Sequence, residues 1–241
     1  MSAQLLTAGF HNENLPHSTL RVIEGGSWKK QRCVVVLPAA DTIPTKVALS
    51  HWSLAFPPNQ PVHRMLAQGC EVGEAYSQAI SEILASTIND WEYLLTIESD
   101  NMPPPDGVVK LIKQLEQHPE YAAIGGLYWC KGPEGVAHAW GDPTDPVLNF
   151  RPQVPRAGEL IECCGTSMGF TMFRLSMFKD ERLRKPWFKT LDGSGGTGIG
   201  TQDLYFWADA RKHGYRCAID CSVKVGHYDF EGKFGPPDMM W

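Results

Sequence analysis

The sequence predicts a single α/β domain in which helices flank a mostly parallel central sheet. Three observations predict it. Short apolar runs alternate with amphipathic segments through the first half, in the order β-α-β-α-β-α-β. The 241 residues suffice for one large domain with a sizeable core, but not for two full ones. The content of 43% hydrophobic and 20% charged residues is ordinary for a globular protein.

The charge and the cysteines exclude several classes of protein. A net charge of −5 argues against a broadly basic nucleic-acid coat, although a local basic groove stays open. No apolar run approaches the roughly 18 residues that span a bilayer, and the N-terminal residues lack the pattern of a secretory signal. Seven cysteines without metal-site spacing fit reduced thiols. We therefore expect a cytoplasmic protein with no membrane span.

The first half of the chain supplies the alternating elements. Proline stands in the first turn of the first expected helix, and the second helix shows an apolar stripe of Val72, Ala75, Ala79, Ile83 and Leu84. Strands are expected at 33–37, 62–66, 93–97 and 121–129, and helices at 44–56, 71–86 and 106–117.

The second half departs from this rhythm, and we expect a mixed arrangement there. Residues 130–158 are rich in Pro, Gly and Asp, which is typical of a functional or mobile excursion. The glycine-rich segment 192–200 lacks the Lys-Ser/Thr of a phosphate-binding loop, so we favour a lid or acceptor loop. Strands are expected at 159–163, 169–174, 215–220 and 222–225, and helices at 175–182 and 201–213.

Glu98-Ser99-Asp100 follows the most apolar strand, and this is the strongest candidate site. Two acidic residues spaced i, i+2 at the end of a strand can point together into the crevice beyond the carboxyl edge, where open α/β sheets bind ligands. Their oxygens suit Mg²⁺ or Mn²⁺, ions that commonly carry nucleotide phosphates. The alternative is a polar turn in which Asp100 and Asn101 cap the next helix.

Two later residues have ordinary alternatives of the same kind. Asp203 lies in the first turn of the helix at 201–213, with Thr201 as a candidate N-cap, and a carboxylate is favoured there by the helix dipole alone. His227 follows the last expected strand, where a single histidine is usually a surface or core group.

Four segments in order resemble the nucleotide-sugar-dependent glycosyltransferases of the GT-A fold, particularly the short single-domain members of phage and bacterial genomes. The resemblance extends from Val34 to about Asp229. The segments are VVVLP with its loop, LLTIESDNMPPPDGVVKLI, IECCGTSMGFTMFR and GTQDLYFWADARKHGYRCAIDCSVKVGHYD. Residues 1–30 are polar and lack periodicity, so we expect an N-terminal arm or a short edge element there, and residues 230–241 form an aromatic, Met-rich C-terminal tail. The resemblance implies a GT-A domain (31–229). Within the domain it implies a nucleotide-sugar-binding half (31–129) and an acceptor or catalytic half (130–229).

The resemblance also implies roles in binding the donor. Glu98-Ser99-Asp100 is similar to the family's DxD motif, with Glu98 where the first Asp usually stands, and Asp100 is the implied ligand of the divalent ion. His227 matches the histidine that often completes the metal shell. Pro38, Ala39 and Asp41 match the loop that holds the nucleoside. Tyr76-Ser77 stands where many members have an Arg-Asn pair.

On the acceptor side, Asp203 matches the second acid of the family's Glu-Asp pair, the catalytic base of inverting members, and Gln202 replaces the Glu. Gly165-Thr166-Ser167 resembles the loop that positions the donor sugar or the acceptor. Flanking tryptophans could stack on sugar faces, although core packing is an equal alternative for each. They are Trp129, Trp140 and Trp187.

The function implied by the resemblance is metal-dependent transfer of a hexose from a nucleoside diphosphate sugar, UDP-sugar first and GDP-sugar next, to an acceptor hydroxyl. The acceptor is a glycan, a protein, a small molecule or a hydroxymethylated base of phage DNA. DNA would require a basic groove, for which the candidates are Lys29, Lys30, Arg32, Arg64, Arg151 and Arg156. The alternatives are a non-catalytic sugar-nucleotide or glycan-binding module and a sugar nucleotidyltransferase.

Overall fold

The computed structural model describes residues 32–39, 42–58, 60–86, 91–131, 135–191 and 200–229. These residues belong to one compact unit that begins at Arg32. The predicted N-terminal arm (1–30) and C-terminal tail (230–241) lie outside the described residues, as do Asp41 and the greater part of the glycine-rich segment (192–199).

A seven-stranded sheet forms the centre of the unit, in the order β2-β1-β3-β9-β5-β10-β7. Strands β2, β1, β3, β5 and β10 share one direction, whereas β9 and β7 run antiparallel to their neighbours. The strands are β1 (Cys33–Pro38), β2 (Val62–Ala67), β3 (Tyr93–Ile97), β5 (Ala123–Leu127), β7 (Leu160–Cys163), β9 (Phe170–Arg174) and β10 (Cys217–Lys224).

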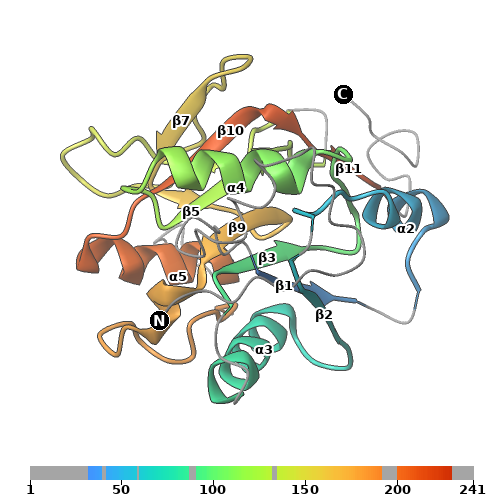
Figure 1. Cartoon of the computed structure of the whole chain (residues 1–241). Coiled ribbons are helices and arrows are strands. Elements are labelled where there is room, and N and C mark those ends of the chain that lie inside the picture. Colours follow the sequence, from blue (N-terminus) through green and yellow to red (C-terminus); the bar gives the residue numbers. More distant parts are fainter. Residues whose placement is uncertain are drawn as a thin grey trace, which may run out of the picture. The chain divides into compact units, whose positions relative to one another are not determined.

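Helices cover both faces of this sheet (Figure 1). The helix α4 (Gly107–Gln117) packs on one face, and α3 (Val72–Ala85) and α5 (Gln202–Ala210) pack on the other. A shorter helix, α2 (Thr45–Trp52), contacts the small strand β4 (Asn101–Met102). The predicted fold class, a single Rossmann-like α/β domain with a mostly parallel sheet flanked by helices and a mixed second half, is confirmed.

The strand β1 shows why its run of β-branched residues lacks a polar face. Val34 and Val36 point into the core under α3 and α5, while Val35 and Leu37 point into the core under α4. Successive side chains alternate between the two faces of a strand, so a strand covered by helices on both faces must be apolar throughout. All seven cysteines are free thiols, four of them in strands of the sheet.

Several predicted elements differ from the structure. The predicted pair of strands at 215–220 and 222–225 is one strand, β10, whose register shifts between Asp220 and Lys224. Asp220 accepts a hydrogen bond from the Ser222 amide, so a local irregularity imitates a break between strands. The segment predicted as a short helix at 175–182 is the 3₁₀ helix η1 (Leu175–Lys179). Tyr76 and Ile80, absent from the predicted stripe of α3, are fully buried.

Two small ribbons complete the carboxyl edge of the sheet. The strand β11 (Gly226–His227) pairs with β4, and β6 (Ala139–Trp140) pairs with β8 (Gly165–Thr166). A 3₁₀ turn, η2 (Arg211–His213), extends α5. Among the described residues, no helix combines the length and the apolar character needed to cross a membrane.

Candidate functional site

A cavity of about 550 Å³ lies at the carboxyl ends of β1 and β3. It brings together five residues that the sequence assigned to donor binding: Pro38, Ala39, Glu98, Ser99 and Asp100. The end of β2, the loop after it and the start of α3 supply further lining residues, which the sequence analysis missed although Gly69 follows the strand: Ala67, Gly69, Cys70, Glu71 and Val72. Asp41 lies outside the described residues.

Asp100 lies against the Lys131 ammonium and the His227 ring. The Lys131 ammonium lies 2.5 Å from its Oδ2 atom, and the Nε2 atom of His227 lies 3.4 Å from the same oxygen. Burial by itself would raise the pKa of Asp100, but the hydrogen bonds and charges of His227 and Lys131 outweigh burial and lower it to about 2. Asp100 is therefore an ionised carboxylate paired with Lys131, and the next helix, α4, has Asp106 and not Asp100 at its N-cap position.

The backbone brings His227 to this place. The ribbon of β11 and β4 sets His227 opposite Asn101, next to Asp100 in the chain, and the Tyr228 amide donates to the Asp100 carbonyl at 2.6 Å. The Nδ1 atom of His227 lies 2.7 Å from the Trp129 carbonyl, which can only accept. Nδ1 therefore carries the hydrogen, and Nε2 is left to face Asp100.

These two side chains fit a divalent ion with an incomplete protein shell. Hard ions take carboxylate oxygens, and Mg²⁺ usually keeps several waters and binds through one or two carboxylates together with substrate phosphates. The part of the chain that the structure describes holds no cluster of three or more Asp, Glu, His and Cys side chains suited to a metal. A shell built on Asp100 and His227 thus leaves most positions to phosphate oxygens and water.

The pKa values of the other two acids of the site shift in the opposite direction. Burial, aided by the charges of Asp100 and Asp203, raises the pKa of Glu98 to about 8, against a weaker opposite effect of Lys131. Asp203 is 6% exposed, and burial raises its pKa too. Hydrogen bonds from the side chains of Thr201 and Ser167 and from the Leu204 amide oppose that rise.

Thr201 occupies the predicted N-cap position of α5 but does not bond to the helix backbone with its side chain. Its hydroxyl bonds to Asp203 instead. Asp203 in turn accepts the Leu204 amide at 2.9 Å, which fixes one of its oxygens. The start of α5 is therefore built around Asp203, a buried carboxyl group that can take up a proton.

Residues 165–167 have two different surroundings: the first two pack against α5, and the third contacts Asp203. Thr166 is fully buried and accepts the indole hydrogen of Trp207 through its carbonyl at 3.0 Å, so it anchors α5. Gly165 packs against the Trp207 ring, where an added Cβ would come within 3.2 Å of two ring atoms. Gly165 and Thr166 do not line the cavity, whereas Ser167 reaches Asp203.

Two residues of the long excursion join the site although the sequence analysis did not single them out. Lys131 pairs with Asp100, and His138 lies with its Nδ1 atom 2.6 Å from the Ser167 hydroxyl. The His138 ring stacks on the Tyr128 ring at a centroid distance of 4.3 Å. Burial, with a smaller contribution from His227, lowers the pKa of His138 to about 3, so its ring is neutral.

The three tryptophans considered for sugar stacking lie in different surroundings. Trp187 is 2% exposed and packs edge-on against Phe178, so it belongs to the core. Trp140 is half-buried and donates its indole hydrogen to Ser167 at 2.8 Å. Trp129 provides the carbonyl that orients His227.

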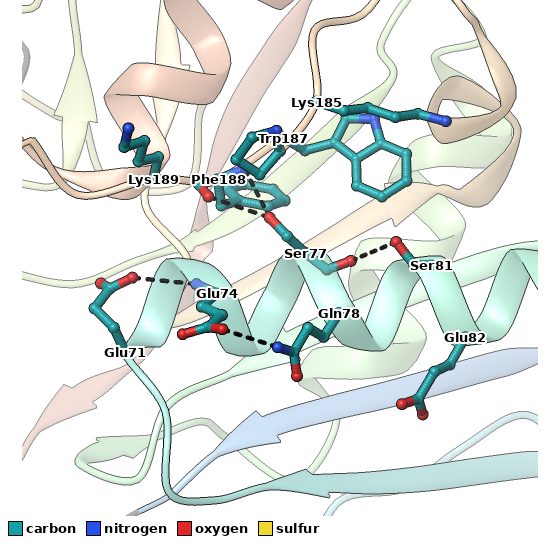
Figure 2. Close-up of a pocket in the computed structure, with 11 residues that line it drawn as sticks. Glu71, Glu74, Ser77, Gln78, Ser81, Glu82, Lys185, Trp187, Phe188 and Lys189 are labelled. Atoms are coloured by element: carbon teal, nitrogen blue, oxygen red, sulfur yellow. Dashed lines mark hydrogen bonds between the residues drawn. The ribbon is translucent and has the colours of Figure 1, made fainter.

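A second groove, of about 650 Å³, runs between α3 and residues 185–189 (Figure 2). Ser77 ties its two sides together: the Ser77 hydroxyl donates to the Phe188 carbonyl and accepts the Phe188 amide. Glu71 caps α3 and lines this groove as well as the cavity beside Asp100. The position where the resembled family often has Asn thus serves here to anchor a neighbouring segment.

Two solved structures are similar to this chain at low sequence identity. A solved structure described as A197 from STIV is 15% identical, with a TM-score of 0.57 over 82% of this chain and 86% of that one. A structure of S. aureus TarS 1-349 is 12% identical, with a TM-score of 0.44 over 81% of this chain and 59% of that one. No family model matches the sequence, and neither does any curated protein. At 15% identity, the similarity to the first of these structures establishes a shared fold alone.

Proposed function

We propose that the protein is a metal-dependent glycosyltransferase that moves a hexose from a nucleoside diphosphate sugar, most simply a UDP-sugar, to an acceptor hydroxyl. The observation that carries the proposal is the pairing of two kinds of carboxylate in one site. Asp100 is ionised and pairs with the Lys131 ammonium, whereas Asp203 is buried and able to take up a proton. Such transfer requires a cation at the leaving diphosphate and a base at the attacking hydroxyl.

Asp100 and His227 would hold Mn²⁺ or Mg²⁺. When bound, the ion would neutralise charge that develops on the departing diphosphate. Pro38, Ala39, Glu98 and Ser99 line the cavity in which the nucleotide would lie. Glu98, whose pKa is raised by burial to about 8, would be protonated at neutral pH and could donate a hydrogen bond to the donor.

Asp203 would remove the proton from the acceptor hydroxyl, and a base at that position gives inversion at the anomeric carbon. A carboxylate whose pKa is raised toward neutrality is better matched to that task than an ordinary one. Determination of the product anomer by NMR tests the stereochemistry, since a retained configuration would remove the base from the mechanism.

The acceptor is a glycan, a protein, a small molecule or a hydroxymethylated base of phage DNA. Of the basic residues considered for a DNA groove, Arg64 lies over the Phe56 ring and Arg156 pairs with Glu159. These two arginines come from β2 and from the loop before β7, so they belong to different elements. The net charge of −5 favours a non-nucleic-acid acceptor.

Two alternatives predict different behaviour. A sugar-nucleotide-binding module would bind the donor without turnover. A nucleotidyltransferase would carry a glycine-rich basic segment directly after the first strand, where this chain has Pro38-Ala39-Ala40-Asp41. That difference favours the glycosyltransferase.

The proposal is tested by thermal unfolding with UDP-, GDP-, ADP- and dTDP-hexoses, each with Mn²⁺ and with EDTA. A ligand present at 100 times its Kd should raise the Tm by roughly 5–10 °C. We expect one nucleotide class to do so, only with Mn²⁺, and Asp100→Asn to abolish the shift. The control Asp106→Asn changes an exposed carboxylate paired with Lys110, and this variant should retain the nucleotide-dependent rise in Tm. No shift with any nucleotide would contradict the proposal.

A further inference from the structure

The Ser167 hydroxyl lies at the centre of a group of polar side chains next to Asp203. It contacts Asp203, the Nδ1 atom of His138 at 2.6 Å and the indole nitrogen of Trp140 at 2.8 Å. The other ring nitrogen of His138, Nε2, lies 3.2 Å from the Cys130 sulfur. A continuous path of hydrogen-bonding groups thus leads from Cys130 through His138 and Ser167 to Asp203.

We propose that Cys130, His138 and Ser167 are positioning residues that hold the Asp203 carboxylate in place for the attacking hydroxyl. Each residue in this chain donates to the next: the Cys130 thiol to Nε2 of His138, Nδ1–H of His138 to Ser167, and the Ser167 hydroxyl to Asp203. The inference rests on the proposed function only in giving Asp203 the role of base. The direction of the hydrogen bonds requires only that Asp203 is ionised, whatever reaction it serves.

The direction follows from counting donors at Ser167. A hydroxyl has one hydrogen to give and two lone pairs. The Trp140 indole can only donate, so it takes one lone pair. The single hydrogen goes to the strongest acceptor, which is the charged Asp203 carboxylate rather than a neutral imidazole. Nδ1 of His138 must then donate to the second lone pair.

The consequence for His138 is one tautomer. With its hydrogen on Nδ1, the neutral ring has an unprotonated Nε2 atom, and the Cys130 thiol at 3.2 Å is the donor that satisfies it. The backbone holds this pair in register, because the Cys130 amide donates to the Val136 carbonyl and the His138 amide donates to the Tyr128 carbonyl. The Tyr128 ring, stacked at 4.3 Å, fixes the plane of the imidazole.

Tyr128 is the competing donor to Ser167. Its hydroxyl contacts Ser167 and accepts the Gly169 amide at 2.9 Å. If Tyr128 filled the second lone pair, Ser167 would have to donate to His138, and Asp203 would lose its hydrogen bond. The tautomer of His138 therefore distinguishes the two arrangements. The other ionisable groups whose charges act on Asp203 or respond to it are Glu98, Tyr76 and Cys130.

The first test needs no substrate. Long-range ¹⁵N–¹H correlation spectra of the ¹⁵N-histidine-labelled protein report which ring nitrogen carries the hydrogen, and the signal lost in His138→Asn assigns the ring. We expect the Nδ1–H form. An Nε2–H form would overturn the inference whatever reaction the protein catalyses.

The second test uses matched variants and the release of UDP from the UDP-hexose that stabilises the protein. Ser167→Ala and His138→Leu should lower kcat by about 10- to 100-fold. His138→Asn keeps an N–H group near the place of Nδ1 and should recover the greater part of that loss. The KM for the donor should change less than about twofold in all three variants, because the hydrogen-bonded side chains contact Asp203 and do not line the donor cavity.

The most conservative pair of variants changes Cys130. Cys130→Ser retains a donor to Nε2 and should keep the wild-type kcat, whereas Cys130→Ala should lose about two- to tenfold. Because Cys130 is partly exposed, both variants should fold even if Ser167→Ala does not. Equal kcat for the two Cys130 variants and the wild type would overturn the positioning role of these hydrogen-bonded side chains.

Asp203→Asn separates the two proposals. If Asp203→Asn transfers sugar at the wild-type rate, Asp203 is not the base. The proposed positioning role of Cys130, His138 and Ser167 then fails as well. If Asp203→Asn is inactive while His138→Leu and Cys130→Ala keep the wild-type kcat, the proposed function stands and only the positioning chain is overturned.

Discussion

Glu98 and Asp100 leave the end of β3 two positions apart, but different partners surround them. Asp100 meets the Lys131 ammonium and His227, and their combined effect outweighs burial and lowers its pKa to about 2. For Glu98, burial and the neighbouring charges of Asp100 and Asp203 raise the pKa to about 8. Two carboxylic acids on one strand end are thus separated into an ionised group and a protonated one.

The difference has a simple physical origin. Closely spaced carboxylates cannot all ionise in a buried site unless cations compensate them, and the Lys131 ammonium pairs directly with Asp100 while its effect on Glu98 is weaker than that of burial. Glu98 and Asp203 therefore retain protons more readily than ordinary carboxyl groups. Acids whose pKa values are driven apart in this way are suited to different tasks, one electrostatic and one involving proton transfer.

The largest expected effect comes from removing the proton acceptor, Asp203. Asp203→Asn should lower transfer by about 10²- to 10⁴-fold, because an amide cannot accept the hydroxyl proton. Nucleotide-dependent thermal stabilisation should persist, since the Asp100 side is unchanged. The control Asp209→Asn alters the same helix at a carboxylate that accepts the Arg184 amide, a bond that an amide oxygen can also accept. Loss of nucleotide binding in Asp203→Asn would show that the two sides are not separable.

A second prediction concerns pH and Glu98. The folded protein retains a proton on Glu98 up to a pKa of about 8, whereas the unfolded chain releases it near 4.5. The stabilisation from this group is therefore complete below pH 4.5 and is lost as the pH rises toward 8. Glu98→Gln stays neutral, so its stability relative to the wild type should rise across that window by about 1–3 kcal/mol.

Urea unfolding between pH 5 and 9 in EDTA measures this effect. The control Glu92→Gln replaces an exposed carboxylate just before β3 and should keep the wild-type pH profile. A constant difference between Glu98→Gln and the wild type over the whole range would contradict the raised pKa of Glu98.

The smallest expected effect is on the Asp100 side. Lys131 occupies the same carboxylate oxygen that a metal ion would take, so Lys131→Met should tighten Mn²⁺ binding in the absence of nucleotide. Because both side chains are partly exposed, the pair is worth little, and we expect about a two- to fivefold lower Kd by calorimetry. Lys110→Met, at an exposed pair with Asp106, should leave the Kd unchanged. Weaker Mn²⁺ binding in Lys131→Met would mean that Lys131 supports the metal site.

The alternating half of the fold could be predicted because its signals are local. An apolar run ending in Glu98-Ser99-Asp100 marks a strand and a site within a few residues, and both the strand and the cavity beside it are present. The boundaries of α2 and η1 were less accurate, because helix ends depend on what the next segment packs against.

The partners of that site could not be predicted in the same way. Lys131 and His138 lie in a Pro- and Gly-rich excursion without periodicity, and their distances to Asp100 and Ser167 depend on contacts 29 to 31 residues away in the chain. The insertion of β9 between β3 and β5 likewise depends on pairing between distant strands. Serine at position 77 gave no sign that it would bind the backbone of a segment 111 residues away.

The position of β9 also constrains the order in which the chain can fold. During synthesis, β3 and β5 emerge before their common neighbour, and each leaves a row of backbone groups unpaired until residues 170–174 arrive. The strands β3 and β5 are therefore joined only through contacts of large sequence separation, and β10, which pairs with β5, emerges later still. A ribosome that stalls before residue 170 would hold an apolar half-sheet with open edges, which makes this one strand a point of vulnerability to aggregation and to chaperone capture.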